Sequence, residues 1–553
     1  MQMMNHHGGM ASQQYPDLPP PPLMRGIGNA SLRITTNSEQ AQAYFNQGLR
    51  LLHDFWDFES YRAFKEAARL DPNAAMAYWG EFEALKMRGP AKDDTRAALD
   101  KAKSLMDKVS DHERYYIRAA QHELSEKSED KAAYEHEMET LIDHYPDDQD
   151  AQALFALSEM DGYDADGNPR PGEMYSQMIL RNLLTAHPDN AAANHYWIHA
   201  VEDSSRPEAA LHSADVLASM APNSGHMVHM PGHIYWRVGD YERARESFSA
   251  SMQVDEAYMA AEKIEPANDW NYAHNLAYLI AACAEAGRYH EGLEIAKKLR
   301  DIPSPTGMTA ASFVVWAGAS VARVHIRFGD WQAVPRDPIA FGRSAESVSL
   351  PAQSYAEGLN TYARGMAAIE TGELVEASHQ SDLLDASLWR LEASKPAKKP
   401  DEMDMSAMEP AEDDPTQVLG LLGTMSLDLR GNVKIAQGDA DAGLKLIEQA
   451  AQKEKNLGYS EPPRYFRPEE ESLGYAYLKL KRWDRARDAF TEALHQRPKS
   501  GHALFGIAQS YALAGDATHA TSAYREFLTA WPHADPELPQ VKQANAWLAS
   551  HTN

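Results

Sequence analysis

The chain has 553 residues, and its 53 Lys and Arg residues face 81 Asp and Glu residues, which gives a formal net charge of −28. This excess of negative charge argues against a surface built to bind nucleic acid or anionic lipid, and it favours cationic partners or metal ions. The single cysteine, Cys283, excludes a disulfide scaffold and a cysteine-rich zinc module. Any metal ion must therefore be held by histidine and carboxylate side chains.

The N-terminal segment gives the only hint about compartment. Residues 1–23 are a run of Met, His, Gly, Gln and Pro without an apolar core, so no signal peptide is visible as written. We therefore expect either a cytoplasmic protein or a periplasmic or secreted form from which a signal has been removed. The longest uncharged stretch, 302–322, contains prolines and a glycine, so we expect no membrane insertion and predict a buried helix over 310–322.

An internal repeat of 34 residues is visible near the C-terminus. Gly474 is followed by Tyr477, Ala486, Phe490, Ala493 and Pro498, and 34 residues after five of these positions come Ala508, Tyr511, Ala520, Tyr524 and Pro532. The same offsets link Gly48, Phe64, Ala67 and Pro72, and also Gly232, Tyr235, Ala244 and Phe248. Two antiparallel helices per unit explain the pattern, because small residues let the helices approach, the aromatic ring fills the groove and proline ends the second helix.

This spacing resembles the tetratricopeptide repeat. Strand signals are few, so the sequence predicts an all-α chain folded as a solenoid of helical hairpins. The resemblance implies a right-handed superhelix with a concave groove. The predicted organisation is a Met/His/Pro-rich tail (1–35), N-terminal helical repeats (36–190), His-rich central repeats (191–300), further helical repeats (301–394), an acidic Met-rich loop (395–416) and C-terminal repeats (417–553).

Histidines gather in the central repeats. At 100° per residue, His226, His229 and His233 fall within about 60° of one another on one helix face, and His195, His199 and Glu202 share a similar arc. His195 and His229 are one 34-residue period apart, and so are His199 and His233. A further repeat, shifted by 48 residues, matches His226 with His274.

The first helix of each tetratricopeptide unit lines the concave wall, so the resemblance implies that these histidines point into the groove. We therefore predict a transition-metal site drawn from His195, His199, His226, His229, His233 and His274, of which three or four bind the ion. Glu202 is the candidate catalytic base, or else a partner that orients a ligand from outside. The alternative is a seam of histidines with a purely structural or peptide-binding role.

Three segments also resemble a group of largely uncharacterised bacterial tetratricopeptide-repeat proteins: 195–202, 225–233 and 272–275. That group implies a further histidine three positions after the one matching His274, where this chain has Ala277. The resemblance supports the fold and the importance of the cluster, but it implies no reaction.

The metal itself is left open between copper and zinc, with iron also compatible, because imidazole suits all three. Copper gains weight from methionines in the tail and in the acidic loop, since thioethers select Cu(I); the alternative for both tracts is ordinary disordered sequence. These residues are Met1, Met3, Met4, His6, His7 and Met10, with Met403, Met405 and Met408.

A proline-stiffened stretch from 459 to 468 offers Glu461, Tyr465 and Arg467. Either it closes the groove over a substrate, or it packs between repeats.

The sequence leaves two functions open for the protein. The first is a metal-binding repeat protein, with hydrolytic or oxygen and redox chemistry if it is a metalloenzyme, whose groove takes an unknown small molecule or peptide. The second is a non-catalytic scaffold for a peptide or protein. Six imidazoles in place of the Lys, Arg and Asn typical of a peptide groove favour the metal.

Overall fold

The computed structural model describes residues 19–87, 93–124, 127–164, 167–304, 308–342, 348–395, 415–458, 460, 462–463 and 465–551. These residues form helices and connecting turns, and their only β-type contact is an isolated bridge between Tyr163 and Pro169. The predicted all-α fold is therefore confirmed. None of the described helices has the length and the apolar character that crossing a membrane requires.

The chain divides into two compact units. The first comprises the described residues up to Val238 and then Glu246–Tyr272, and the second comprises Gly239–Arg245, Ala273–Ser304 and the described residues from Met308 onward. Helices α12 (Tyr241–Glu262) and α13 (Trp270–Glu285) each contribute to both units. The division falls inside the stretch 191–300.

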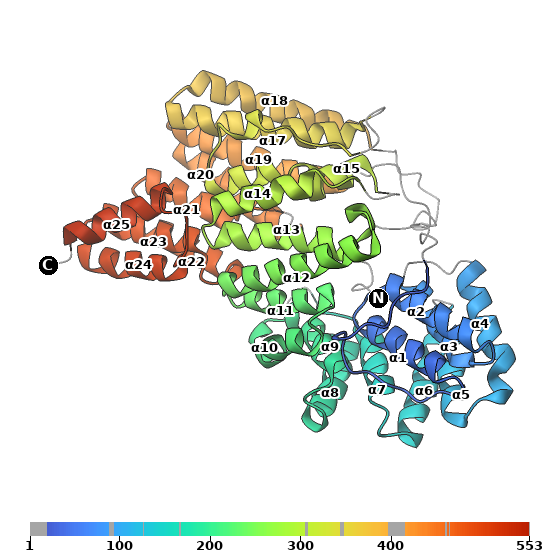
Figure 1. The fold of residues 1–553 in the computed structure, drawn as a ribbon. Coiled ribbons are helices and arrows are strands. Elements are labelled where there is room, and N and C mark those ends of the chain that lie inside the picture. Colours follow the sequence, from blue (N-terminus) through green and yellow to red (C-terminus); the bar gives the residue numbers. More distant parts are fainter. Residues whose placement is uncertain are drawn as a thin grey trace. The chain divides into compact units, whose positions relative to one another are not determined.

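The first unit begins with successive hairpins, visible in Figure 1 in the order of the chain. Its other helices are α1 (Glu39–His53), α2 (Asp57–Leu70), α3 (Ala75–Lys86), α4 (Asp93–Leu105), α5 (Asp111–Ala120), α6 (Ser128–His144), α7 (Gln149–Glu159), α8 (Pro171–Ala186), α9 (Ala191–Glu202), α10 (Leu211–Met220) and α11 (Gly225–Arg237). Short 3-10 turns cover Met106–Lys108, Pro207–Ala210 and Pro266–Asn268.

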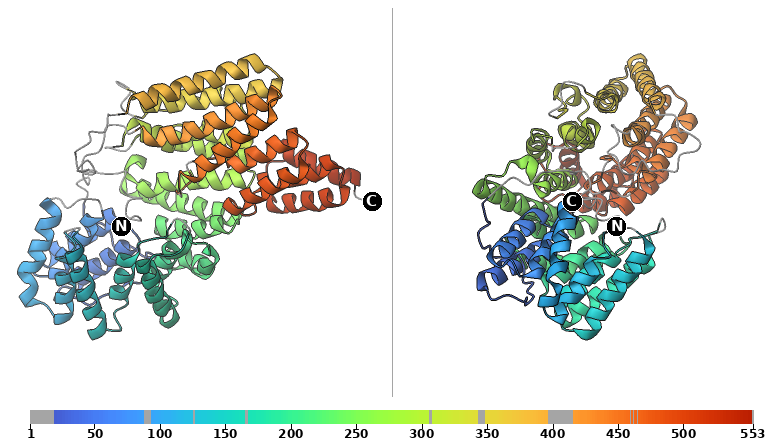
Figure 2. Two further views of the ribbon diagram at one scale, coloured as in Figure 1. Left: turned by 180° about the vertical axis from the view of Figure 1, so that it is seen from behind. Right: turned by 90° about the vertical axis from the view of Figure 1, so that its right-hand side faces the viewer.

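The second unit repeats this arrangement, and Figure 2 shows from two further directions that α17 with α18 and α19 with α20 lie side by side. Its helices are α14 (Tyr289–Arg300), α15 (Ala310–Phe313), α16 (Ser320–Phe328), α17 (Leu350–Thr371), α18 (Leu374–Ala393), α19 (Thr416–Ala436), α20 (Ala440–Lys455), α21 (Glu469–Lys479), α22 (Trp483–Gln496), α23 (Gly501–Ala514), α24 (Ala517–Ala530) and α25 (Pro539–His551). A π-helical turn, Val314–Gly318, separates α15 from α16, so the helix predicted over 310–322 is interrupted, and a 3-10 turn covers Val334–Arg336.

At the repeat positions, the glycines of first helices lie against the aromatic rings of second helices, as the sequence predicts. A Cβ atom added at Gly48 would lie 2.7 Å from the ring of Phe64, and one added at Gly474 would lie 2.7 Å from the ring of Phe490. At Gly232 the corresponding distance to Phe248 is 2.4 Å. Glycine is needed at these positions because the aromatic ring of the second helix lies against the backbone of the first.

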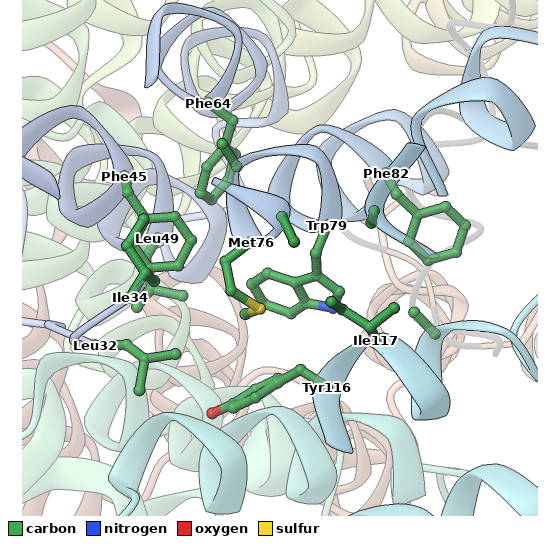
Figure 3. Close-up of a cluster of buried hydrophobic side chains, with 14 of the residues drawn as sticks. Leu32, Ile34, Phe45, Leu49, Phe64, Met76, Trp79, Phe82, Tyr116 and Ile117 are labelled. Atoms are coloured by element: carbon green, nitrogen blue, oxygen red, sulfur yellow. The ribbon is translucent and has the colours of Figure 1, made fainter. Parts of the chain in front are cut away.

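A continuous apolar core joins the helices from α1 to α7 in the first unit. Figure 3 shows the indole of Trp79 between Met76 and Tyr116, and its ring centroid lies 5.1 Å from that of Tyr116. Trp79 is 2% exposed, so this ring is almost entirely removed from water.

The N-terminal residues also contact later helices of the same unit. The backbone N–H of Asn223 donates to the Gly26 carbonyl at 2.8 Å, and the N–H of Ala191 donates to Asn29 Oδ1 at 3.1 Å. These bonds connect the N-terminal residues to the N-terminal ends of α9 and α11, the two helices that carry most of the predicted site.

Candidate metal centre

Two helices present the histidines of the first unit. Asn190 caps the N-terminus of α9 by accepting a hydrogen bond from the N–H of Ala193 at 2.8 Å, and the helix carries His195, His199 and Glu202. α11 carries His226, His229 and His233. The structure therefore brings five of the six predicted histidines together with Glu202 on neighbouring helices, as the helical arcs indicate.

Three imidazoles meet at their Nε2 atoms. His195 Nε2 lies 3.1 Å from His199 Nε2 and 3.1 Å from His226 Nε2. We call these three residues the Nε2 triad. His195 is fully buried and His226 is 6% exposed, so the triad is largely shielded from bulk water.

Each member of the triad has its other ring nitrogen next to an oxygen acceptor. His195 Nδ1 lies 2.7 Å from the backbone carbonyl of His53, and His199 Nδ1 lies 2.9 Å from Glu202 Oε1. His226 Nδ1 lies 3.3 Å from Asn271 Oδ1, and the amide orientation of Asn271 is fixed because its Nδ2 donates to Asp255 at 2.8 Å.

These contacts determine where the lone pairs point. A carbonyl or carboxylate oxygen only accepts, so the Nδ1 atom facing it carries the hydrogen, and a neutral imidazole of that tautomer has its lone pair on Nε2. Burial first, and the neighbouring His199 second, lower the pKa of His195, which favours its neutral form. The Nε2 lone pair of His195 then faces those of His199 and His226, each across 3.1 Å, which is repulsive unless a cation or shared protons lie between them.

The spacing suits a metal ion. Nitrogens bound at about 2.0–2.1 Å from Zn²⁺ in tetrahedral directions lie roughly 3.3 Å apart. Ligating histidines also typically donate their second ring N–H to a carboxylate or carbonyl oxygen, as all three do here.

A second pair of imidazoles lies along the same two helices. His233 Nε2 is 2.7 Å from His229 Nε2, and His233 Nδ1 donates to Glu202 Oε2 at 2.6 Å. Glu202 therefore accepts from His199 with one oxygen and from His233 with the other. Burial works against its charge, but His233 and His199 hold the pKa of Glu202 below its ordinary value, so it remains a carboxylate.

The contacts of Glu202 distinguish between its two predicted roles, a catalytic base and a partner that orients a ligand. Both of its oxygens already accept hydrogen bonds from imidazoles, and the residue is 5% exposed. The arrangement fits an orienting partner better than a base that collects a proton from a substrate.

Sequence reasoning missed Phe55, whose ring covers the triad. Its centroid lies 4.7 Å from the ring of His195, 5.3 Å from that of His199 and 5.7 Å from that of His226. Phe55 has a φ of 56°, in the left-handed region that is costly for a residue with a side chain. The surrounding packing holds this conformation, and it places an apolar surface over the polar cluster.

His53, also missed, connects the triad to a cleft. Besides accepting through its carbonyl, His53 has Nε2 at 3.1 Å from Asp150 Oδ1 and Nδ1 at 2.9 Å from the hydroxyl of Tyr196. Asp150 in turn lines a cleft of about 620 Å³ in the first unit. The cleft has four carboxylates and three imidazoles on its walls: Asp147, Asp148, Asp150, Asp189, His112, His144 and His187.

The remaining predicted ligand, His274, lies on α13 in the part of the chain that belongs to the second unit. It is half-buried, and its ring packs edge-on against Tyr278 with centroids 5.3 Å apart. The methionine and histidine residues singled out in the tail and in the acidic loop lie outside the described residues, as does Glu461.

Comparison with family models identifies two stretches of the chain as tetratricopeptide repeats, residues 227–258 and residues 472–535. The first stretch includes His229 and His233, and the second includes the 34-residue repeat recognised from its spacing. The chain therefore carries tetratricopeptide repeats in both halves. No curated protein gave a significant match.

Several solved structures are similar over most of the chain. Yeast Tom70 is 12% identical, with 92% of this chain and 96% of that one covered at a TM-score of 0.30. Human IFIT1, solved as a dimer with m7Gppp-AAAA, is 13% identical, with coverage of 90% and 91% and a TM-score of 0.30. The Cut9–Hcn1 hetero-tetramer of the APC/C is 14% identical, with coverage of 93% and 76% and a TM-score of 0.28. TM-scores this low do not establish a shared overall arrangement.

Proposed function

We propose that this protein is a metal-binding tetratricopeptide-repeat protein, and that His195, His199 and His226 bind one transition-metal ion through their Nε2 atoms. One observation carries the proposal. The Nε2 atoms of His199 and His226 each lie 3.1 Å from Nε2 of the fully buried His195, while each of the three Nδ1 atoms faces an oxygen acceptor. A metal ion turns this repulsive arrangement of lone pairs into three bonds.

The donor set limits the choice of metal. Three neutral nitrogens suit zinc and copper, with iron also compatible, whereas magnesium and calcium prefer oxygen ligands. Glu202, the carbonyl of His53 and Asn271 would orient the imidazoles and keep their Nε2 atoms unprotonated. A fourth position, if open, would serve hydrolytic or oxygen chemistry.

The acidic cleft supports the same function. Its four carboxylates attract cations, and Asp150 connects it to the triad through His53. We propose that metal ions approach the site through this cleft.

The competing proposal is a non-catalytic scaffold for a peptide or protein, with the histidines as a structural seam. In that case the imidazoles share protons instead of a metal ion, and at least one member of each close Nε2 pair must be protonated there.

Elemental analysis of the full chain, purified without chelator, distinguishes the two. We expect close to one zinc, copper or iron per chain, and loss of that metal in His195→Ala with His226→Ala. His212→Ala is the matched control, because His212 lies on α10 of the same unit and is exposed. A metal content that is the same in the double variant as in the control would favour the scaffold.

A further inference from the structure

A second group of metal-ligating side chains lies in the second unit. His290 belongs to the first turn of α14, and Asp535 and Glu537 lie between α24 and α25, 245 and 247 residues further along the chain. Each residue offers one donor atom, and the three donor atoms lie within 4.8 Å of one another. We call these residues the His290 cluster. Two distant parts of the chain thus bring one imidazole and two carboxylates together.

Several contacts hold the backbone that carries the His290 cluster. The N–H of Asp535 donates to the Gly287 carbonyl at 3.0 Å, and the N–H of His290 donates to Asp535 Oδ2 at 2.8 Å. The indole N–H of Trp531 donates to the carbonyl of Glu285 at 2.7 Å. A Cβ added at Gly287 would lie 2.6 Å from the Trp531 ring, so the two segments are closely packed. The ligand-bearing backbone is therefore preorganised, which reduces the entropy lost when an ion binds.

The donor atoms of the cluster are accessible and only partly used. The side chains of His290 and Glu537 are 61% and 51% exposed, and they hydrogen-bond to each other through Nε2 and Oε1. A metal ion can replace the hydrogen between these two atoms. Asp535 accepts the His290 N–H with one oxygen, and no described residue donates to the other. Separations of up to 4.8 Å exceed the roughly 3.3 Å between tetrahedral zinc ligands, so rotation of the exposed side chains must bring the donors closer.

The His290 cluster differs from two other surface histidines of the same unit. His519 lies 2.7 Å from the carboxylate of Asp516, three residues away on the same helical turn. His495 likewise lies 3.0 Å from the carboxylate of Glu492. Each of these pairs offers two donors, whereas His290 meets two carboxylates from a remote segment. Three protein ligands are what zinc sites with an open position typically supply, and the formal net charge of −28 favours the approach of cations.

We propose that His290, Asp535 and Glu537 bind an exchangeable divalent transition-metal ion, with water in the remaining positions. One imidazole with two carboxylates suits zinc, cobalt or nickel, whereas magnesium and calcium prefer oxygen ligands alone. Water competes at the two exposed ligands, so the ion should exchange faster here than at the buried Nε2 triad. A bound ion would connect the start of α14 to the segment before α25. The two sites share no residue, so this proposal does not depend on the triad.

The test is a zinc titration of the metal-free full chain at pH 7.5, in competition with a chromophoric chelator. His195→Ala with His226→Ala is introduced first, so that the Nε2 triad does not contribute. We expect this chain to bind zinc reversibly, and its thermal unfolding temperature to rise with the zinc concentration. Magnesium at the same concentrations should not raise it. If the double variant does not fold, the comparisons below are made in the unaltered chain, where the His290 cluster should add one equivalent of zinc.

His290→Ala should weaken zinc binding at this site at least about tenfold, because it removes a ligand. His519→Ala is the matched control, since His519 is also exposed but has one carboxylate beside it. Glu537→Gln should likewise weaken binding, whereas Glu492→Gln should not. All four side chains are exposed, so the variants should fold, which circular dichroism checks. Equal zinc affinity in His290→Ala and His519→Ala would overturn the proposal, as would the absence of zinc binding. A magnesium response equal to that of zinc would overturn the assignment to a transition metal.

Discussion

Replacing Glu202 by glutamine is the sharpest perturbation of the proposed metal centre. The carboxylate accepts from His199 Nδ1 at 2.9 Å and from His233 Nδ1 at 2.6 Å. A glutamine side chain has one acceptor oxygen and one NH₂ group, so it can satisfy only one of these two donors. If the NH₂ group faces His199, the hydrogen of that imidazole moves to Nε2, where it blocks metal binding; if the NH₂ group faces His233, the triad keeps its tautomers and loses only the nearby negative charge.

The expected loss of metal affinity in Glu202→Gln follows from the orienting role of the carboxylate. Changes to groups that orient metal ligands typically weaken metal binding 10- to 100-fold, which is about 1.4–2.7 kcal/mol. Glu202→Gln also removes a negative charge that lies near the bound cation, so we expect an effect near the upper end of this range. Glu202→Asp keeps the charge and should lose less.

Competition between the protein and a chromophoric chelator at neutral pH measures the affinity, and circular dichroism checks that the helices persist. Glu208→Gln is the matched control, because Glu208 belongs to the same unit and its side chain is 54% exposed. If Glu202→Gln bound the metal as tightly as the control, the proposed contribution of the Glu202 carboxylate to the metal centre would be refuted.

Three further outcomes are expected. Phe55→Ala uncovers the triad, so metal should exchange with a chelator about tenfold faster than in Phe55→Leu, because water reaches the ligands. Equal exchange rates in the two variants would contradict the covering role of Phe55. Gly474→Ala should lower the free energy of unfolding by roughly 1–3 kcal/mol, because the added Cβ meets the ring of Phe490. A second change, Phe490→Leu, should recover part of this loss, as a double-mutant cycle measured by urea denaturation would show. Burial lowers the pKa of His502 to about 4, so the unfolded chain binds this proton at a higher pH than the folded chain does, and the free energy of unfolding should fall by about 3 kcal/mol as the pH drops from 6.5 to 4. His502→Gln should flatten that part of the pH profile of stability. An unchanged profile would contradict the assignment of this pH dependence to His502.

Local patterns explain what could be predicted from the sequence. The helical hairpins follow from contacts within one repeat, such as the ring of Phe64 against Gly48, and these recur at a fixed offset. The arcs of histidines on α9 and α11 likewise follow from helical geometry. Both kinds of signal lie within a few dozen residues of sequence.

The rest depends on contacts that leave no such pattern. His53 orients His195 through a backbone carbonyl, which every residue has, and Phe55 covers the triad from 140 residues away in the chain. Asn271 was not singled out because an amide on a helix is common. The π-helical turn at Val314–Gly318 has no marker in composition either, so the interruption of the helix predicted over 310–322 is visible only from the structure.

The bond between the His53 carbonyl and His195 joins residues 142 apart in sequence. Repeat arrays usually fold by nearest-neighbour contacts, so that each hairpin can form next to the previous one. Here His195 is not oriented by the His53 carbonyl until the first hairpin has docked against α9, and the entropy of closing that long loop must be lost beforehand. Acquisition of metal would then be one of the last events of folding in this unit, and a bound ion, by fixing His195, would strengthen the contact between the beginning of the repeat array and its middle.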